Sequence, residues 1–411
     1  MKRIVAILAL LFLAAEARAD FAAGMAAYQA GNHAAALAEW QPLAETGNAN
    51  AQYMLGRLHA RGEAVAKDIE AAAKWFAKAG DQGIVDAQVY LARLYDKGDG
   101  VPRDEAQAAK WYRLAAEAGI PEAQYRIAQI YDQGIGIRVD RGEAARWYRQ
   151  AADAGSGEAQ YRLGRIHEAG EGVREDLAEA AKWYLKAGEQ GAADAQYRIA
   201  RLYERGTGVA RDEAAATKWY RAAAAGGIAD AQYQAAKRLA AGLGAPANEA
   251  EASRWYLAAA AKGIVDAQFQ IARRFENGIG VERSFEDAAK WYKPAAEQGI
   301  TEAEYAIGRF YAAGLGVAAN DSEAAKWLAR AADKGVVNAQ FMMGFVAFNG
   351  RGAPRDNVQA YVWYTLAARN FPTEAERTVA IKDRDTVAKL MSPEQVQRAQ
   401  LIARDWKPKP Q

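Results

Sequence analysis

The side chains that could carry chemistry in this 411-residue chain are 51 carboxylates and three histidines. Paired carboxylates can act as general acid and base, and histidine can bind a metal or move protons. The carboxylates, however, recur where helices are expected to begin, as Glu143, Glu179 and Glu213 do, and there they favour the positive end of the helix dipole. His59 and His167 take a repeated position that five of the seven other units fill with Tyr or Phe, which favours packing. These residues therefore predict no catalytic residue and no metal ligand.

The sequence also lacks other motifs typical of enzymes. Each Gly-x-Gly pair lacks the preceding strand that a phosphate or dinucleotide loop requires, and no serine stands in a G-x-S-x-G context. The chain has no cysteine, which excludes disulfides, a thiol nucleophile and a cysteine metal site. We therefore expect a protein that is not an enzyme and that binds no cofactor.

Two columns of side chains suit binding rather than catalysis. At a step of 36 residues, the position after an Ala-Gln or Ala-Glu pair is aromatic in eight of nine units, and the position four residues later is Arg or Lys in seven. Tyrosine and arginine are enriched at binding hot spots because they combine contact area with several donors. The candidate partner-binding residues lie in the middle units and are Tyr125, Tyr161, Arg165, Tyr197, Arg201, Tyr233 and Arg273.

The sequence leaves two interpretations of these columns open. In the first, the rings only pack between stacked helices. Acids three residues further on would then neutralise the basic side chains, as Asp96 would for Arg93 and Glu276 for Arg273. In the second, the columns bind a protein or peptide partner with acidic or carboxylate groups along residues 122–273.

The elements that must position these columns recur with a period of 36 residues. Nine tryptophans keep this step without a slip, and they are Trp75, Trp111, Trp147, Trp183, Trp219, Trp255, Trp291, Trp327 and Trp363. A fixed period between about 20 and 50 residues is typical of solenoids and arrays.

Within a unit the apolar spacing is helical. Ala195, Ile199 and Leu202 fall at i, i+4 and i+7, and Gly206 suits a left-handed helix C-cap. Asp212 suits the N-cap of a second helix. The inner face of that helix is predicted to hold Ala216, Trp219, Tyr220 and Ala223. Each unit is therefore a helix hairpin, and neighbouring hairpins must stack because one hairpin cannot bury its own face.

The repeated pattern A-x-x-x-LG-x-x-Y-x-x-G-x-GV-x-x-D-x-x-x-A-x-x-WY-x-x-AA-x-x-G resembles the Sel1-like repeat family, relatives of the tetratricopeptide repeat. The resemblance covers residues 50–373 as nine units. It implies an all-α fold, a right-handed α/α superhelix (solenoid) of stacked helix hairpins whose first helices line a concave groove. It also implies adaptor or regulator roles in cell-envelope or host-contact complexes. The β-lactamase-like relatives carry cysteine pairs that this chain lacks, so that activity is not carried over.

Residues 1–19 are predicted to be a signal peptide. Lys2 and Arg3 precede an apolar run over residues 4–15, and a small-x-small cleavage site ends at Ala19. We expect cleavage after Ala19, a secreted or periplasmic protein, and no membrane span afterwards. The leader holds three of the 53 basic and one of the 51 acidic residues, which leaves 50 of each. A nucleic-acid partner normally needs a basic excess, so that class of partner is excluded.

The repeats are flanked by atypical segments. Residues 20–49 are predicted to form a degenerate N-terminal hairpin, and residues 374–411 to form C-terminal capping helices and a loose tail. Ser392 and Gln395 have the spacing of a capping box.

Two adjacent repeats depart from the pattern. Arg238 and Arg274 sit in an otherwise apolar column, and Pro294 lies inside a second helix. Proline removes a backbone hydrogen bond and kinks a helix. The departures predict either a bend or softer joint near 235–295, or drift in a tolerant solenoid.

Taken together, the residues predict an exported scaffold or adaptor that binds an extended partner in the groove. The rival hypothesis is a cell-envelope enzyme or enzyme modulator related to peptidoglycan, because tyrosine rings can stack on sugars. A host-directed effector would differ only in its destination.

Overall fold

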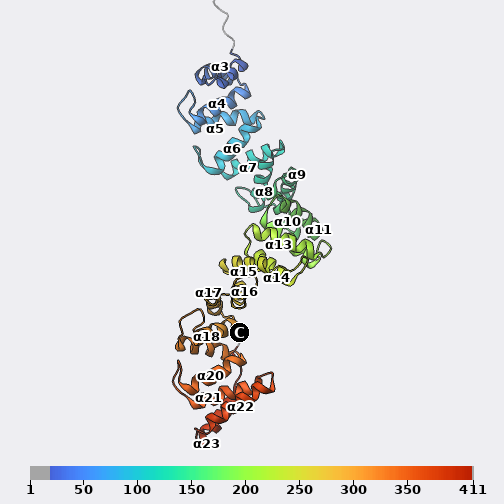
Figure 1. Cartoon of the computed structure of the whole chain (residues 1–411). Coiled ribbons are helices and arrows are strands. Elements are labelled where there is room, and N and C mark those ends of the chain that lie inside the picture. Colours follow the sequence, from blue (N-terminus) through green and yellow to red (C-terminus); the bar gives the residue numbers. More distant parts are fainter. Residues whose placement is uncertain (1–18, 410–411) are drawn as a thin grey trace, which may run out of the picture. The chain divides into compact units, whose positions relative to one another are not determined.

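The computed structural model describes residues 19–409, and every regular element in that range is an α-helix (Figure 1). Apart from Ala19, the predicted signal peptide lies outside the described residues. Consecutive helices of the repeats pack against one another within each of two compact units, so the prediction of an all-α solenoid of stacked helix hairpins is confirmed. Between residues 19 and 409, no helix combines the length and the apolar composition that a membrane crossing needs.

The first compact unit holds an N-terminal hairpin and four repeats. Its helices are α2 (Phe21–Gln29), α3 (His33–Glu45), α4 (Ala49–Arg61), α5 (Ile69–Asp81), α6 (Val85–Lys97), α7 (Glu105–Glu117), α8 (Pro121–Gln133), α9 (Arg141–Asp153), α10 (Gly157–Ala169) and α11 (Leu177–Glu189). Even numbers mark the first helix of a hairpin and odd numbers the second.

The second compact unit holds five repeats and two capping helices. Its helices are α12 (Ala193–Arg205), α13 (Glu213–Ala225), α14 (Ala229–Ala241), α15 (Glu249–Ala261), α16 (Val265–Asn277), α17 (Phe285–Glu297), α18 (Thr301–Ala313), α19 (Asp321–Asp333), α20 (Val337–Asn349), α21 (Asn357–Asn370), α22 (Glu374–Ala388) and α23 (Pro393–Asp405).

In eight of the nine repeats the turn inside the hairpin carries two glycines, which serve two different purposes, and in the first repeat Ala64 takes the second position with φ of 61°. Gly242 ends α14 in the left-handed region, with φ of 65°. Gly244 also has positive φ, and a Cβ there would lie 2.0 Å from the carbonyl oxygen of Glu213 in the preceding repeat. After the turn, the side chain of Asn248 caps α15 by accepting from the Glu251 amide at 3.0 Å. The Gly-x-Gly motif therefore both ends the first helix and lets neighbouring repeats approach closely.

The glutamine of the Ala-Gln pair joins one repeat to the next. Gln232 is buried, and its amide donates to the carbonyl of Ala224 near the end of the preceding helix, at 3.2 Å. The tryptophans lie at the same seam. In three repeats the indole N–H donates to a glutamate four residues earlier, as that of Trp327 does to Glu323 at 3.0 Å. In these repeats the seam buries aromatic area without leaving the indole donor unpaired.

Arg238 is not a packing defect in its apolar column. The residue is 3% exposed, and its guanidinium donates to the Thr217 hydroxyl and to Glu204, both at 2.8 Å. It also pairs with Glu213. Thr217 stands where most repeats have alanine, and its hydroxyl donates onward to the carbonyl of Leu243 at 2.6 Å. The arginine and the threonine therefore form a matched polar substitution.

The following repeat carries the same substitution in a second version. Arg274 is 7% exposed, donates to the Ser253 hydroxyl at 3.0 Å and pairs with Glu249 at 2.7 Å. Helix α17 runs through Pro294 and keeps the 13-residue length of its neighbours. The departures that the sequence associates with a softer joint are thus occupied by buried, partnered side chains and an unbroken helix.

The C-terminal end is closed by α22 and α23. Both begin with capping boxes, which include the predicted pair Ser392 and Gln395. Trp406 packs edge-on against Trp363, with ring centroids 6.4 Å apart. The sequence predicts a loose tail. In the structure, the Lys409 amide donates to the carbonyl of Asp333 at 2.8 Å, so the tail contacts α19 at Lys409.

Candidate functional site

The predicted tyrosines lie on the first helices and are half-buried. Each ring rests against a buried tyrosine of the second helix in its own hairpin, with centroids 5.7 to 6.0 Å apart. The pairs are Tyr125 with Tyr148, Tyr161 with Tyr184, Tyr197 with Tyr220, and Tyr233 with Tyr256. One part of every ring therefore packs and another part faces solvent, so packing and binding are compatible.

The basic column lies beside the aromatic one. The Arg201 guanidinium lies 5.8 Å from the Tyr197 ring centroid, and that of Arg273 lies 5.7 Å from the Phe269 ring. Arg165 and Arg273 are exposed. Because a cation over a ring is attracted to it while its outer N–H donors stay free, the arrangement presents donors in a fixed orientation. We call the surface formed by these aromatic and basic columns over residues 122–273 the first-helix ladder.

The acids three residues after Arg93 and Arg273 do not pair with these arginines of their own repeats. Asp96, which the sequence pairs with Arg93, instead pairs with Arg126 and accepts from the Tyr112 hydroxyl at 3.4 Å. Arg93 pairs with Glu122 of the next repeat. The predicted pairing of Arg93 with Asp96 is therefore wrong.

The same exchange of partners occurs further along the chain. Glu276 pairs with Arg309 and accepts from the Tyr292 hydroxyl, rather than from Arg273. Within residues 19–409, neither Arg201 nor Arg273 makes an ion pair. These two guanidiniums keep their charge available.

Carboxylates of the following repeat border the ladder. Burial, and then the nearby Asp230 carboxylate, raise the pKa of Tyr197. Burial and Asp266 raise the pKa of Tyr233 in the same way. The surface therefore offers rings, cations and anions in a repeating order, which suits an extended polar chain better than a single small anion.

The strongest candidate for proton transfer surrounds His167. Its ring faces Arg149, whose guanidinium lies 3.3 Å from Nε2, and burial followed by that positive charge lowers the pKa of His167. Burial opposes ionisation of neighbouring Glu179, but hydrogen bonds from Lys182, Arg149 and Trp183 outweigh it and lower its pKa to about 2. A carboxylate that stays ionised near neutral pH is a poor proton donor. Among residues 19–409, no three His, Asp or Glu side chains are grouped to hold a metal ion.

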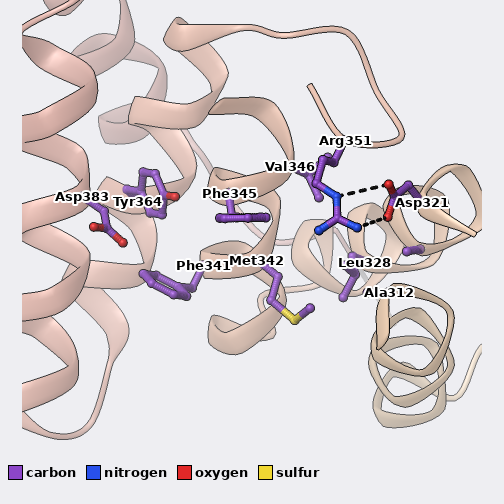
Figure 2. Close-up of a pocket in the computed structure, with 11 residues that line it drawn as sticks. Ala312, Asp321, Leu328, Phe341, Met342, Phe345, Val346, Arg351, Tyr364 and Asp383 are labelled. Atoms are coloured by element: carbon purple, nitrogen blue, oxygen red, sulfur yellow. Dashed lines mark hydrogen bonds and ion pairs between the residues drawn. The ribbon is translucent and has the colours of Figure 1, made fainter. Parts of the chain in front are cut away.

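A second surface lies at the C-terminal end of the second unit and was not predicted. It is a cavity of about 260 Å³ whose walls come from α18 to α22. Figure 2 shows Phe345 between Tyr364 on one side and the Arg351–Asp321 ion pair on the other. The sequence signal was Phe345, which stands where seven other repeats have Arg or Lys.

Comparisons with known proteins agree with this architecture. The Sel1 repeat model matches nine consecutive segments, at residues 49–84, 85–120, 121–156, 157–191, 193–228, 229–264, 265–300, 301–336 and 337–370. No curated protein matches the chain.

Two solved structures resemble the chain over most of its length. One is c5321, a protective antigen of uropathogenic Escherichia coli strains with an SLR fold. It is 29% identical, has a TM-score of 0.51, and the match covers 90% of this chain and 94% of that one. The other is a Sel1 repeat protein from Oxalobacter formigenes. It is 30% identical, has a TM-score of 0.53, and the match covers 75% of this chain and 90% of that one.

Proposed function

Because this chain belongs to the Sel1 repeat family, we propose that it is an exported scaffold that binds an extended protein partner along the first-helix ladder. Repeat solenoids present long surfaces built from equivalent positions, which suits recognition of a chain rather than of a small molecule. Within each compact unit, the ladder supplies such positions in consecutive repeats, two in the first unit and three in the second.

The observation that best supports binding is the state of Arg201 and Arg273. Each lies over an aromatic ring and neither makes an ion pair within the described residues. Stacking on the ring restricts the guanidinium before a partner arrives, so less side-chain entropy is lost on binding. Acidic or carboxylate groups of a partner would form ion pairs with these arginines. The bordering acids would repel a partner segment that is acidic along its whole length.

Export is supported by the start of the fold. The Asp20 side chain caps α2, and its backbone nitrogen donates to the Glu39 carboxylate at 2.9 Å. Cleavage after Ala19 would turn that nitrogen into an α-amino group, and the same contact would become an ion pair. Mass spectrometry of the protein from a periplasmic fraction should find Asp20 as the first residue.

The rival function, a peptidoglycan-related enzyme or modulator, is supported only by the tyrosine rings. They can stack on sugars, yet the residues nearest to them offer no acid and base in one pocket. Purified protein that released fragments from cell-wall material would favour this rival over the scaffold.

The scaffold proposal is tested by charge reversal at matched sites. Residues 20–411 would capture partners from envelope extract beside the double variant Arg201→Glu with Arg273→Glu, and the captured protein would then be purified for affinity measurement. The control is Arg254→Glu with Lys290→Glu, which reverses two exposed charges on second helices. We expect the first pair to weaken binding about tenfold or more and the control to leave it unchanged. Equal binding by both variants would rule out the ladder.

A further inference from the structure

The cavity beside the last repeat exists because two side chains are smaller than the repeat pattern requires and a third position carries phenylalanine in place of a basic residue. Leu328 stands where seven of the nine repeats have the tyrosine of the Trp-Tyr pair. Ala312 stands at the position of Glu276, whose carboxylate accepts a hydrogen bond from that tyrosine in its own repeat. Phe345 takes the position of the basic residue in the next repeat. The shortened side chains of one repeat thus open a space beside the first helix of the next, and the neighbouring structure does not refill it.

The space has the size and lining of a side-chain pocket. Its volume of about 260 Å³ exceeds the roughly 150 Å³ that suffices to hold a benzene ring. Phe341, Met342 and Val346 form apolar walls, and Phe345 is left 47% exposed at the mouth. Covering this exposed ring with an apolar group is favourable, by about 25 cal/mol for each Å² of apolar surface removed from water.

The charges at the pocket are unbalanced. At one end, Arg351 donates to both carboxylate oxygens of Asp321, at 2.9 and 3.1 Å, so those charges cancel. At the other end, Asp383 of α22 lies beside Tyr364, and within residues 19–409 its carboxylate makes no ion pair or hydrogen bond (Figure 2). Burial, together with the Asp383 charge, raises the pKa of Tyr364 to about 12, so the hydroxyl there stays neutral.

The rim continues along α22. Asp383 and Thr386 also line an adjoining hollow with Phe345 and Phe348, and Val379, one turn before Asp383, is 51% exposed. Residues four apart lie on one face of a helix, so Val379 and Asp383 are neighbours. An anion therefore stands between two exposed apolar surfaces.

We propose that this C-terminal pocket docks a segment of a partner protein that carries one bulky apolar side chain, Phe or Leu, next to a lysine or arginine. The apolar side chain fills the hollow against Phe341 and Phe345, and the cation pairs with Asp383. The first-helix ladder is basic, so the two surfaces select opposite charges and the pocket functions independently of the ladder.

The proposal can be tested with short probes and an NMR reporter inside the pocket. The methyl group of Met342 lines the cavity, and selective ¹³C labelling of the five methionines in residues 20–411 gives a spectrum simple enough to assign with Met342→Leu. The probes are the acetylated hexapeptides GSFKSG, GSFESG and GSAKSG, added to residues 20–411. We expect GSFKSG to shift the Met342 signal in a saturable manner, GSFESG to bind about threefold or more weakly, and GSAKSG to bind about tenfold or more weakly.

Two variants and their controls separate the two parts of the site. Asp383→Asn should remove the preference for GSFKSG over GSFESG, while Asp385→Asn, an exposed acid two residues away, should keep it. Phe345→Arg restores the residue type of other repeats and should abolish binding of all probes, whereas Leu401→Arg on α23 should not. Equal shifts with all three probes, or no shift at all, would overturn the proposal. A Met342 shift that depends on protein concentration alone would also overturn it, because the occupant would then be a second copy of this chain. The scaffold proposal concerns residues 122–273 and the probes are placed at Phe341, Phe345 and Asp383, so any of these results leaves the scaffold proposal untouched.

Discussion

Truncating Arg238 tests whether the atypical repeats near 235–295 form a soft joint or a rigid one. Arg238→Ala removes a side chain that is 3% exposed, together with its bonds to Thr217, Glu204 and Glu213. The two carboxylates are about one-third exposed (side-chain exposures of 34% and 32%), so solvent screening limits each ion pair to about 0.5–1 kcal/mol. The hydroxyl bond and the buried stem add about 1 kcal/mol each. The expected loss is about 3 kcal/mol.

The assay must resolve local stability because repeat arrays need not unfold in one step. Hydrogen exchange by mass spectrometry would follow α12 to α15 in the native chain and in Arg238→Ala. Arg238→Leu is the matched control, since it restores the apolar residue of other repeats and leaves Thr217 bonded to Leu243, Glu204 to Tyr220 and Glu213 to Arg211. We expect the larger increase in exchange across these helices in the alanine variant and a smaller one in the leucine variant, which also loses the polar bonds but refills the apolar column. If the native chain already exchanges rapidly over 229–300 and neither variant changes it, the reasoning is refuted and the soft joint is correct.

Three further changes probe the seams between repeats. Gly244→Ala should cost about 2 kcal/mol or more in thermal unfolding, because its Cβ would meet the Glu213 backbone, whereas Gly263→Ala, which has positive φ but open space, should cost about 1 kcal/mol; equal losses would contradict the close approach. Burial raises the pKa of Tyr256 from 10.0 to about 12. The stability that this tyrosine contributes is therefore complete below pH 10 and is lost as the pH rises toward about 12. In alkaline unfolding, the stability of Tyr256→Phe should fall less steeply with pH than that of the native chain. Glu304 replaces the seam glutamine, is fully buried and pairs with Arg330 at 2.7 Å and Lys334 at 3.0 Å, so Glu304→Gln should lower the unfolding midpoint in urea by leaving two cations unpaired, and an unchanged midpoint would count against those pairs.

The hairpins could be predicted from the sequence because their signals are local. An N-cap such as Asp212 and a C-cap such as Gly206 act within one turn of their own helix, and the period of 36 residues repeats them nine times. The partners of charged side chains could not be predicted, because they depend on the distance between successive repeats. Asp96 lies three residues from Arg93 in sequence, yet it pairs with Arg126, which stacking brings beside it.

The C-terminal pocket was missed for a related reason. It is defined by side chains that are smaller than the pattern requires, at Leu328 and Ala312, and by Asp383 on a capping helix outside the repeat period. A repeat pattern indicates only the residues that recur. It therefore gives no sign of a cavity formed by two smaller side chains and by a residue outside the repeats. Phe345, the break in the basic column, was its one visible trace.

The central claim is that a partner lies along the first-helix ladder, and photo-crosslinking tests it most directly. A benzophenone amino acid would replace exposed Lys237 on first helix α14 in one protein and exposed Arg254 on second helix α15 in another, each irradiated with the captured partner. We predict a cross-linked complex from position 237 and none from position 254. A complex formed from position 254 alone would place the partner on the second helices and contradict the account.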